Sequence, residues 1–372
     1  MRALEIGALG ITRPPFAAVV AQAQSLEADG FDVVWYSDHF LHWFPPGVWT
    51  PDLVPQAAQA RTPHVFFDPL PLMAAAAQAT ERIRLGTGVT DPVRRHPAVL
   101  AQSFLTLDHA TGGRAVLGIG AGEAENIVPF GLRYERTASR LIEAVEVIRL
   151  LWSTTEPVDF AGDHFTLRNA ILGLEPVGDR PPPIWMATHR PRVLEATGRL
   201  ADGWLPNILD PAGYGRALAA LRRASVAAGR PEGAVTAGLY AWMVVHEDRD
   251  AVERLLDSLL LRLIALTAPA EEFERAGAEH PLASRWGLLD FVPTELAREE
   301  ALAAAAAVPG EVLRGYYFWG TPDDVVARLA PFRAAGMEHV DLVNVTPLAD
   351  PAGAAAAPSR TRDVATGLRA LG

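Results

Sequence analysis

The chain alternates short apolar stretches with longer segments in which apolar residues recur every three or four positions. The short stretches are rich in β-branched and aromatic residues, as buried strands are, whereas the spacing in the longer segments is typical of amphipathic helices. This alternation predicts eight strand–helix units. The predicted strands cover residues 4–9, 33–36, 82–89, 114–120, 183–188, 202–206, 235–245 and 339–344.

Eight such units joined by right-handed crossovers predict a (β/α)8 TIM barrel, formed by a single domain over residues 1–372. The alternative is a doubly wound open sheet with a second domain, which would carry a dinucleotide fingerprint. Gly118, Gly120 and Gly122 lack that spacing and do not lead directly into a helix. Three stretches interrupt the alternation and are predicted as insertions, at about residues 41–69, 156–172 and 266–313.

The 41–69 insertion is rich in proline, which excludes a regular helix there. It also holds several aromatic residues, including Trp43 and Trp49, and long loops inside compact domains are usually functional or disordered. Because the aromatic content argues against disorder, we predict an ordered lid.

The amino-acid composition argues against several kinds of partner and several kinds of chemistry. All 33 basic residues are Arg and 44 residues are acidic, so the net charge of -11 argues against a nucleic-acid partner. The chain has no Cys, which excludes disulfides and thiolate metal sites, and no Lys, which excludes Schiff-base chemistry. It shows no signal-peptide pattern and no apolar run of membrane-spanning length. We therefore expect a cytoplasmic protein that acts on a small molecule.

Polar side chains follow several predicted strands, whose carboxyl ends would meet at one mouth of a barrel. His39 and Glu123 are candidate acid and base groups there, and Trp43 could stack on a planar ring. Each also has a structural alternative, as a hydrogen-bonded strand-end residue or as lid packing. The ten His show no spacing typical of metal ligands, so we predict no metal site.

Several motifs, in this order and spacing, resemble the luciferase-like monooxygenase superfamily, in its branch that uses the 5-deazaflavin coenzyme F420. The resemblance spans essentially the whole chain and is greatest to phthiodiolone ketoreductase-like members. The motifs are Ser37-Asp38-His39-Phe40, Leu85 to Thr90, His96 to Gln102, Gly113 to Glu123, Gly198 to Trp204 and Gly320 to Val325.

The resemblance implies a barrel with F420 across its mouth, hydride transfer at ring carbon C5, a cis peptide between Gly88 and Val89, and a homodimer. It implies that His39 exchanges a proton with the substrate oxygen, that Glu123 serves the N1 side of the ring, and that Trp43 shields the reacting face. His39 and Glu123 would lie on opposite sides of the ring. The implied cofactor contacts are Asp38, His39, Thr87, Gly88, Val89, Thr90, Gly122, Asn126, Thr188 and His189.

The substrate is expected to be an apolar ketone or its alcohol, because the lid is aromatic and no Lys is present to bind a phosphate. Two alternatives stay open at this point. One is an FMN-dependent two-component monooxygenase on the same barrel, and the other is a non-catalytic barrel that binds F420 or an apolar ligand. A hydrolase built on Glu123 and Glu125 is a more distant alternative.

Overall fold

The computed structural model describes residues 3–207 and 210–371 and contains a sheet of ten strands, each parallel to its neighbours. The strand order is β11-β10-β12-β1-β2-β3-β4-β7-β8-β9. The strands are β1 (Glu5–Leu9), β2 (Val33–Tyr36), β3 (Arg84–Thr87), β4 (Ala115–Ile119), β7 (Ile184–Met186), β8 (Gly203–Trp204), β9 (Thr236–Ala237), β10 (Tyr240–Val245), β11 (Phe318–Gly320) and β12 (His339–Asn344).

The sheet closes on itself between β9 and β12. While β9 pairs with β8, the N–H of Glu338 donates to the carbonyl of Ala237 at 2.7 Å. The N–H of Leu239 then donates to the carbonyl of His339 at 3.0 Å. Eight strand positions therefore form a ring, and the prediction of a TIM-barrel fold is confirmed.

The seventh predicted strand, 235–245, differs from the observed one because it is split into β9 and β10. A side chain at Gly238, between the two, would meet the carbonyl of Trp204 at 2.5 Å, so the main chains approach closely there. Beyond this point the chain leaves β8, and β10 pairs with β11 as well as with β12. The short strand β11 was not among the predicted strands.

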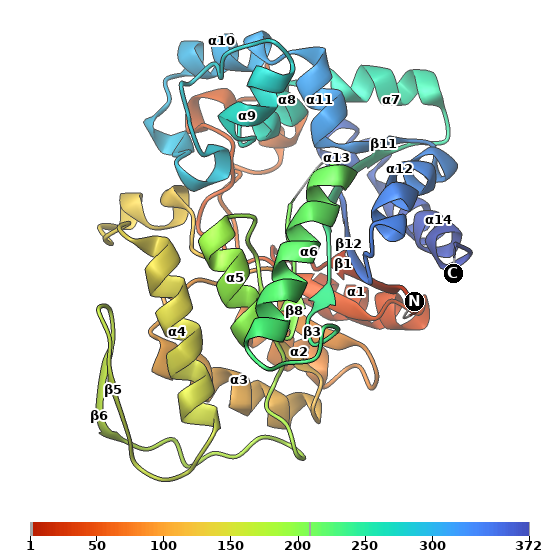
Figure 1. Cartoon of the computed structure of the whole chain (residues 1–372). Helices are drawn as coiled ribbons and strands as arrows, with labels where there is room; N and C mark the ends of the chain where they lie inside the picture. The colour runs from red at the N-terminus through yellow and green to blue at the C-terminus, as the bar shows by residue number, and fades with distance from the viewer. Residues whose placement is uncertain (1–2, 208–209, 372) are drawn as a thin grey trace.

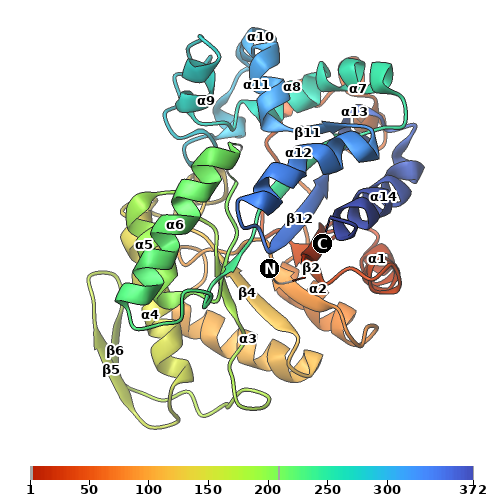
Figure 2. The ribbon, with the colours of Figure 1, turned by 45° about the vertical axis from the view of Figure 1, so that its right-hand side comes forward.

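Helices surround the barrel, as Figures 1 and 2 show. Many of them begin at proline, which suits the first turn of a helix because that turn leaves N–H groups unpaired. No helix of the described ranges combines the length and the apolarity that crossing a membrane requires. The helices are α1 (Phe16–Ala28), α2 (Pro69–Ala77), α3 (Pro97–Thr111), α4 (Thr137–Trp152), α5 (Pro191–Leu200), α6 (Pro211–Ala227), α7 (Arg249–Leu256), α8 (Leu259–Ala265), α9 (Ala270–Arg275), α10 (Arg298–Ala307), α11 (Gly310–Tyr316), α12 (Pro322–Ala334), α13 (Thr346–Ala349) and α14 (Ala357–Arg369).

The insertions take three different forms. The 41–69 insertion has two 3₁₀ turns, Pro46–Val48 and Pro55–Ala58, before α2 begins at Pro69. The 156–172 insertion is an antiparallel hairpin of β5 (Val158–Ala161) and β6 (Thr166–Ala170), which lies low in Figure 1, while the helices of the 266–313 insertion lie at the top.

The 41–69 and 266–313 insertions share one apolar core. Phe44 and Val48 from the first pack in a buried cluster with Phe273 and Phe291 from the last. Arg298, at the start of α10, adds a hydrogen bond from its guanidinium to the hydroxyl of Thr50. The two segments therefore form a joint cover, although 196 residues, 70–265, separate them in the chain.

Candidate active site

A cavity of about 630 Å³ opens at the carboxyl ends of the barrel strands, beneath this cover. Its volume is in the range of small-molecule and cofactor sites. Segments that follow β2, β3, β4, β7 and β8 line it, together with residues of both covering insertions. The predicted site residues on its wall are Asp38, His39, Trp43, Gly88, Val89, Thr90, Gly122, Glu123, Asn126, Thr188 and His189.

Thr87 is the predicted cofactor contact that does not line this cavity. It is fully buried in β3, and its hydroxyl donates to the carbonyl of Gly118 at 2.7 Å and accepts from the N–H of Gly118 at 3.1 Å. The side chain therefore joins β3 to β4 and lies behind the cavity wall.

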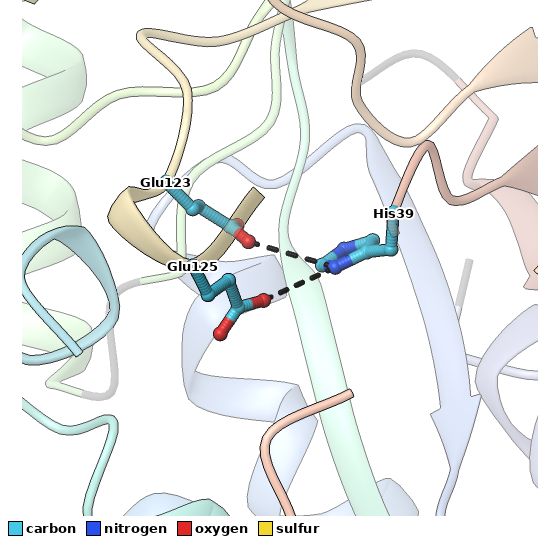
Figure 3. A group of neighbouring side chains, drawn as sticks. All are labelled: His39, Glu123 and Glu125. Atoms are coloured by element: carbon cyan, nitrogen blue, oxygen red, sulfur yellow. Dashed lines mark hydrogen bonds and ion pairs between the residues drawn. The ribbon is translucent and has the colours of Figure 1, made fainter. Parts of the chain in front are cut away.

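The ring nitrogen Nδ1 of His39 is surrounded by polar groups from the loop after β4, as Figure 3 shows. It lies 3.2 Å from Oε1 of Glu125, 3.7 Å from Oε2 of Glu123 and 3.1 Å from the amide nitrogen of Asn126. Because these groups occupy the Nδ1 side, the other ring nitrogen, Nε2, is left for a ligand in the cavity. His39 is also stacked on Phe66 of the 41–69 insertion, with a centroid distance of 5.5 Å.

The direct contact between His39 and Glu123 corrects the expected arrangement on opposite sides of a planar ring. At 3.7 Å between Nδ1 and Oε2, no ring fits between the two side chains. Both come from strand-end loops and lie at the same edge of the cavity. Any planar ligand is therefore approached by both groups from one side.

Glu125 belongs to the same cluster, although no role in redox chemistry was predicted for it from the sequence. Its side chain is fully buried, and its Oε2 has no hydrogen-bond partner among the described residues. Burial raises the pKa of Glu125 to about 8, with His39 opposing the shift and Glu123 adding to it. The 3₁₀ turn Ala124–Asn126 turns this carboxyl group inward. The sequence shows only two Glu residues two positions apart in a loop, so it does not reveal which of them is buried.

The protonation of His39 depends on its acidic neighbours. Burial alone would lower the pKa of the imidazole, but Glu123 and Glu125 together outweigh burial and raise it. The imidazolium form is therefore favoured by the same carboxyl groups that hold Nδ1. A protonated imidazole beside a cavity can give a proton to a bound oxygen atom.

Asp38 is buried, and the side chains around it neutralise it. Its carboxylate accepts hydrogen bonds from the hydroxyl of Thr90 at 2.7 Å, from Arg94 at 3.2 Å and from Arg95 at 3.0 Å. Although burial would raise the pKa of Asp38, the two guanidinium groups and Thr90 lower it overall. Neither arginine was predicted as part of the site, because nothing in the sequence pairs them with a residue more than 50 positions earlier.

Main-chain atoms form part of the cavity wall. The peptide between Gly88 and Val89 is cis, as the resemblance implied. A side chain at Gly120 would meet Cγ2 of Val89 at 2.9 Å, and Gly122 has a φ of 86°, which favours glycine. The glycines after β3 and β4 therefore bring two backbone segments close together beside a possible planar ligand.

Aromatic side chains line another part of the cavity. Trp43 meets His39 edge to face at 5.5 Å and Trp242 at 5.2 Å. Its indole Nε1 is buried and has no hydrogen-bond partner among the described residues, and the same holds for Oδ1 of Asn207. A donor and an acceptor that line one cavity without partners suit the polar groups of a ligand that binds there.

The His39, Glu123 and Glu125 side chains also place three possible metal-ligand atoms within 4.8 Å of one another. Nothing in the sequence spacing indicated this grouping. The neighbouring carboxyl groups raise the pKa of His39 and burial raises the pKa of Glu125, so protons compete with a cation for the same lone pairs.

Residues 4–339 match the model of the family described as luciferase-like monooxygenase. The chain is 36% identical over 337 residues to the phthiodiolone/phenolphthiodiolone dimycocerosates ketoreductase of Mycobacterium tuberculosis (strain ATCC 25618 / H37Rv), covering 89% of this chain and 88% of that protein. It is 28% identical over 314 residues to the 5,10-methylenetetrahydromethanopterin reductase of Archaeoglobus fulgidus, covering 84% and 85%.

Two solved structures share the fold. An F420-dependent secondary alcohol dehydrogenase, in complex with an F420–acetone adduct, superposes with a TM-score of 0.74 at 23% identity over 99% of both chains. The coenzyme F420-dependent tetrahydromethanopterin reductase of Methanopyrus kandleri gives a TM-score of 0.73 at 21% identity, over 96% of this chain and 99% of that one. The family expected from the motifs is confirmed, and the chain belongs to the luciferase-like monooxygenase family.

Proposed function

We propose that this chain is an F420-dependent oxidoreductase that transfers a hydride between the deazaflavin and the carbonyl or alcohol group of an apolar substrate. The observation that carries the proposal is the His39 cluster, which presents a proton-donating imidazole at the wall of a cavity that also has a glycine-rich wall. The ketoreductase relatives at 36% identity, which by name act on ketones, support the same reaction class.

The residues of the cavity suit a deazaflavin with an acidic tail. Gly88, Val89 and Gly122 let a flat ring approach the main chain, and Thr188 and His189 lie on the wall after β7. Arginine guanidinium groups on the same wall suit the phosphate and carboxylates of the tail. These arginines are Arg190, Arg216, Arg275 and Arg285. When bound, F420 would supply the hydride from its C5 atom.

The protein's own part in the reaction is to position the substrate and move a proton. A carbonyl carbon that receives a hydride leaves negative charge on its oxygen, and the imidazolium of His39 can neutralise that charge from Nε2. The free indole N–H of Trp43 can donate a second hydrogen bond to the same oxygen. Trp43 would thus orient the carbonyl as well as shield it from water.

The composition of the wall supports an apolar substrate. Trp43, Tyr240, Trp242, Leu288 and Leu289 line the cavity beside His39 and the cover. Burying an apolar chain against such side chains contributes about 25 cal/mol per Å². A hydrophobic ketone or its alcohol therefore fits this wall better than a phosphorylated sugar.

The experiment that tests the proposal is a pair of anaerobic titrations with F420 and FMN, monitored by cofactor fluorescence, followed by turnover assays. We expect tight binding of F420, weak binding of FMN, and oxidation of reduced F420 by long-chain ketones in preference to sugar phosphates. Oxygen consumption with reduced FMN would instead support a two-component monooxygenase. Binding of F420 without turnover of any carbonyl compound would support a non-catalytic barrel.

Two further expectations belong to this proposal. The homodimer, which the resemblance implies, and the cytoplasmic location, which the sequence analysis expects, both stay predictions. Sedimentation of the purified protein with and without F420 would measure the first, and fractionation of cells that express the chain would measure the second.

A further inference from the structure

The surroundings of Glu125 differ from those expected of a carboxylate with a structural role alone. It is fully buried, yet one of its oxygens, Oε2, has no hydrogen-bond partner among the described residues. Its other oxygen, Oε1, lies 3.2 Å from Nδ1 of His39 and 3.3 Å from the amide nitrogen of Asn126. An ionised carboxylate with one unpaired buried oxygen is costly, whereas a protonated carboxyl group is far less so.

A second carboxyl group lies close by and strengthens this effect. Oε2 of Glu123 accepts from the same Asn126 amide at 3.3 Å and lies 3.7 Å from Nδ1 of His39. Two acidic groups that share one imidazole and one amide cannot both be satisfied as carboxylates without extra protons. The cluster is therefore built to hold protons, and Glu125 is its most buried member.

We propose that Glu125 is a positioning residue for the proposed reduction, and that it acts through His39 by sharing a proton with Nδ1 of the imidazole. The inference rests on the proposed function, in which His39 gives the substrate oxygen its proton. By occupying Nδ1, Glu125 fixes the ring so that Nε2 faces the cavity. By holding the shared proton, it keeps His39 able to donate.

Before the reaction, one proton lies between Glu125 Oε1 and His39 Nδ1, and a second is bound to Nε2. When the hydride with its two electrons reaches the carbonyl carbon, the oxygen gains the π electrons and takes the proton from Nε2. One O–H bond forms and the Nε2–H bond breaks. The shared proton then moves fully onto Nδ1, so the imidazole is left neutral and Glu125 is left as a carboxylate, and solvent later returns one proton to the pair.

The test compares the ligand-free protein with its Glu125→Gln variant, which keeps the shape of the side chain and removes its ionisation. In NMR titrations of the His39 ring, we expect the pKa of His39 to fall by about one unit or more in the variant. In turnover assays we expect kcat for ketone reduction to fall at least about 10-fold with little change in KM, since His39 loses its support as an acid. The loss of rate expected of the wild type above about pH 8 should begin at lower pH in the variant.

Glu143→Gln is the matched control. Glu143 is also a buried glutamate, but it accepts from the backbone N–H groups of Asp163, His164 and Phe165 and does not line the cavity of about 630 Å³. Its variant should leave the His39 titration and the alkaline loss of rate unchanged. Equal His39 pKa values in the wild type and in Glu125→Gln, with the alkaline loss of rate at the same pH in both, would overturn the proposal.

A measurement on the wild type decides the matter if Glu125→Gln does not fold. With the side-chain carboxyl carbons of Glu labelled with ¹³C, one carboxyl group should stay protonated at pH 7 and titrate near pH 8. If every Glu titrates in the ordinary acidic range, the shared proton does not exist. Neither titration requires F420, so a failure of the shared proton is separate from a failure of F420 turnover.

Discussion

Oδ1 of Asn126 accepts a hydrogen bond from the backbone N–H of Phe40 at 2.7 Å. The same oxygen accepts a second bond from the N–H of Leu41 at 3.1 Å. These two bonds tie the loop after β4 to the segment that follows His39. The position of His39 is therefore fixed through the backbone next to it as well as through the contacts of Nδ1. The resemblance implied that Asn126 contacts the cofactor, and its position on the cavity wall permits that in addition.

Replacing Asn126 with Ala should therefore loosen the His39 segment. The two N–H groups lose their acceptor, which costs roughly 1–3 kcal/mol for each group that stays buried without a partner. We expect lower stability in urea unfolding and a lower kcat. Asn344→Ala is the control, because Asn344 also accepts from a backbone N–H, that of Thr346, but does not line the cavity. If the control loses as much activity as Asn126→Ala, the effect is one of stability alone.

His39→Ala should abolish most of the turnover and leave cofactor binding nearly intact. A positioned acid or base contributes about 10²–10⁴-fold to a rate, and we expect a loss in that range. The F420 dissociation constant, measured by fluorescence, should change by only a few fold, because the glycine-rich wall and the arginines are untouched. His109→Ala, at an exposed histidine that bonds to the carbonyl of Glu175, is the control and should keep full activity. Unchanged turnover in His39→Ala would refute the role assigned to this residue.

The sequence predicted the barrel and the position of the site because both depend on local patterns. Apolar periodicity marks the strands, and the residues just after them, such as His39 and Glu123, must reach the same mouth in any closed parallel barrel. The break of the seventh strand at Gly238 was not predictable in the same way. It results from a close approach to Trp204, a contact between segments that no local pattern encodes.

The detailed geometry of the site could not be predicted from the sequence, for the same reason. Glu123 and Glu125 are two positions apart in one loop, and only the 3₁₀ turn at Ala124–Asn126 decides which carboxyl group is buried. Likewise, Arg94 and Arg95 are recognisable as partners of Asp38 only when β2 and β3 are placed side by side. The sequence thus predicts which residues belong to the site, whereas their arrangement depends on charge pairs between segments that are distant in the chain.

Asp38→Asn should destabilise the protein strongly. The change leaves Arg94 and Arg95 buried or half-buried with one counter-charge fewer, and breaking a buried ion pair costs about 3–5 kcal/mol. Since the folded-state pKa of Asp38 lies below the ordinary value of 3.8, its contribution is present above that pH and is lost as the pH falls through the folded pKa. Urea unfolding at pH 7 and at pH 3 should show a large difference from wild type at pH 7 and a smaller one at pH 3.

The control for this prediction is Asp68→Asn. Asp68 also pairs with Arg95, at 3.1 Å, but its side chain is about half exposed and the pair is screened by solvent. Its variant should be within about 1 kcal/mol of wild type at either pH. A similar stability for the two variants would mean that burial of Asp38 does not govern its contribution.

Trp43→Phe should lower activity without lowering stability. The indole Nε1 has no partner among the described residues, so its removal breaks no hydrogen bond within the chain. If it donates to the substrate oxygen, its loss should reduce kcat/KM by about 10–100-fold, which corresponds to about 1–3 kcal/mol. Trp49→Phe should instead lower stability and leave kcat/KM unchanged, since Nε1 of Trp49 donates to the carbonyl of Ala60 at 2.7 Å. Equal kcat/KM for Trp43→Phe and wild type would exclude this hydrogen bond.

The rates of ketone reduction and of alcohol oxidation should depend on pH in opposite ways, because both reactions exchange a proton with the His39–Glu125 pair. Ketone reduction consumes the proton on Nε2 and needs the shared proton to replace it, so its rate should fall as the pH rises past about 8, the pKa of Glu125. Alcohol oxidation needs a free Nε2 to accept a proton, so its rate should rise over the same range. Initial rates in both directions, measured from pH 6 to pH 10 with saturating cofactor, test this. Parallel profiles for the two directions would show that a step other than proton exchange at His39 limits turnover.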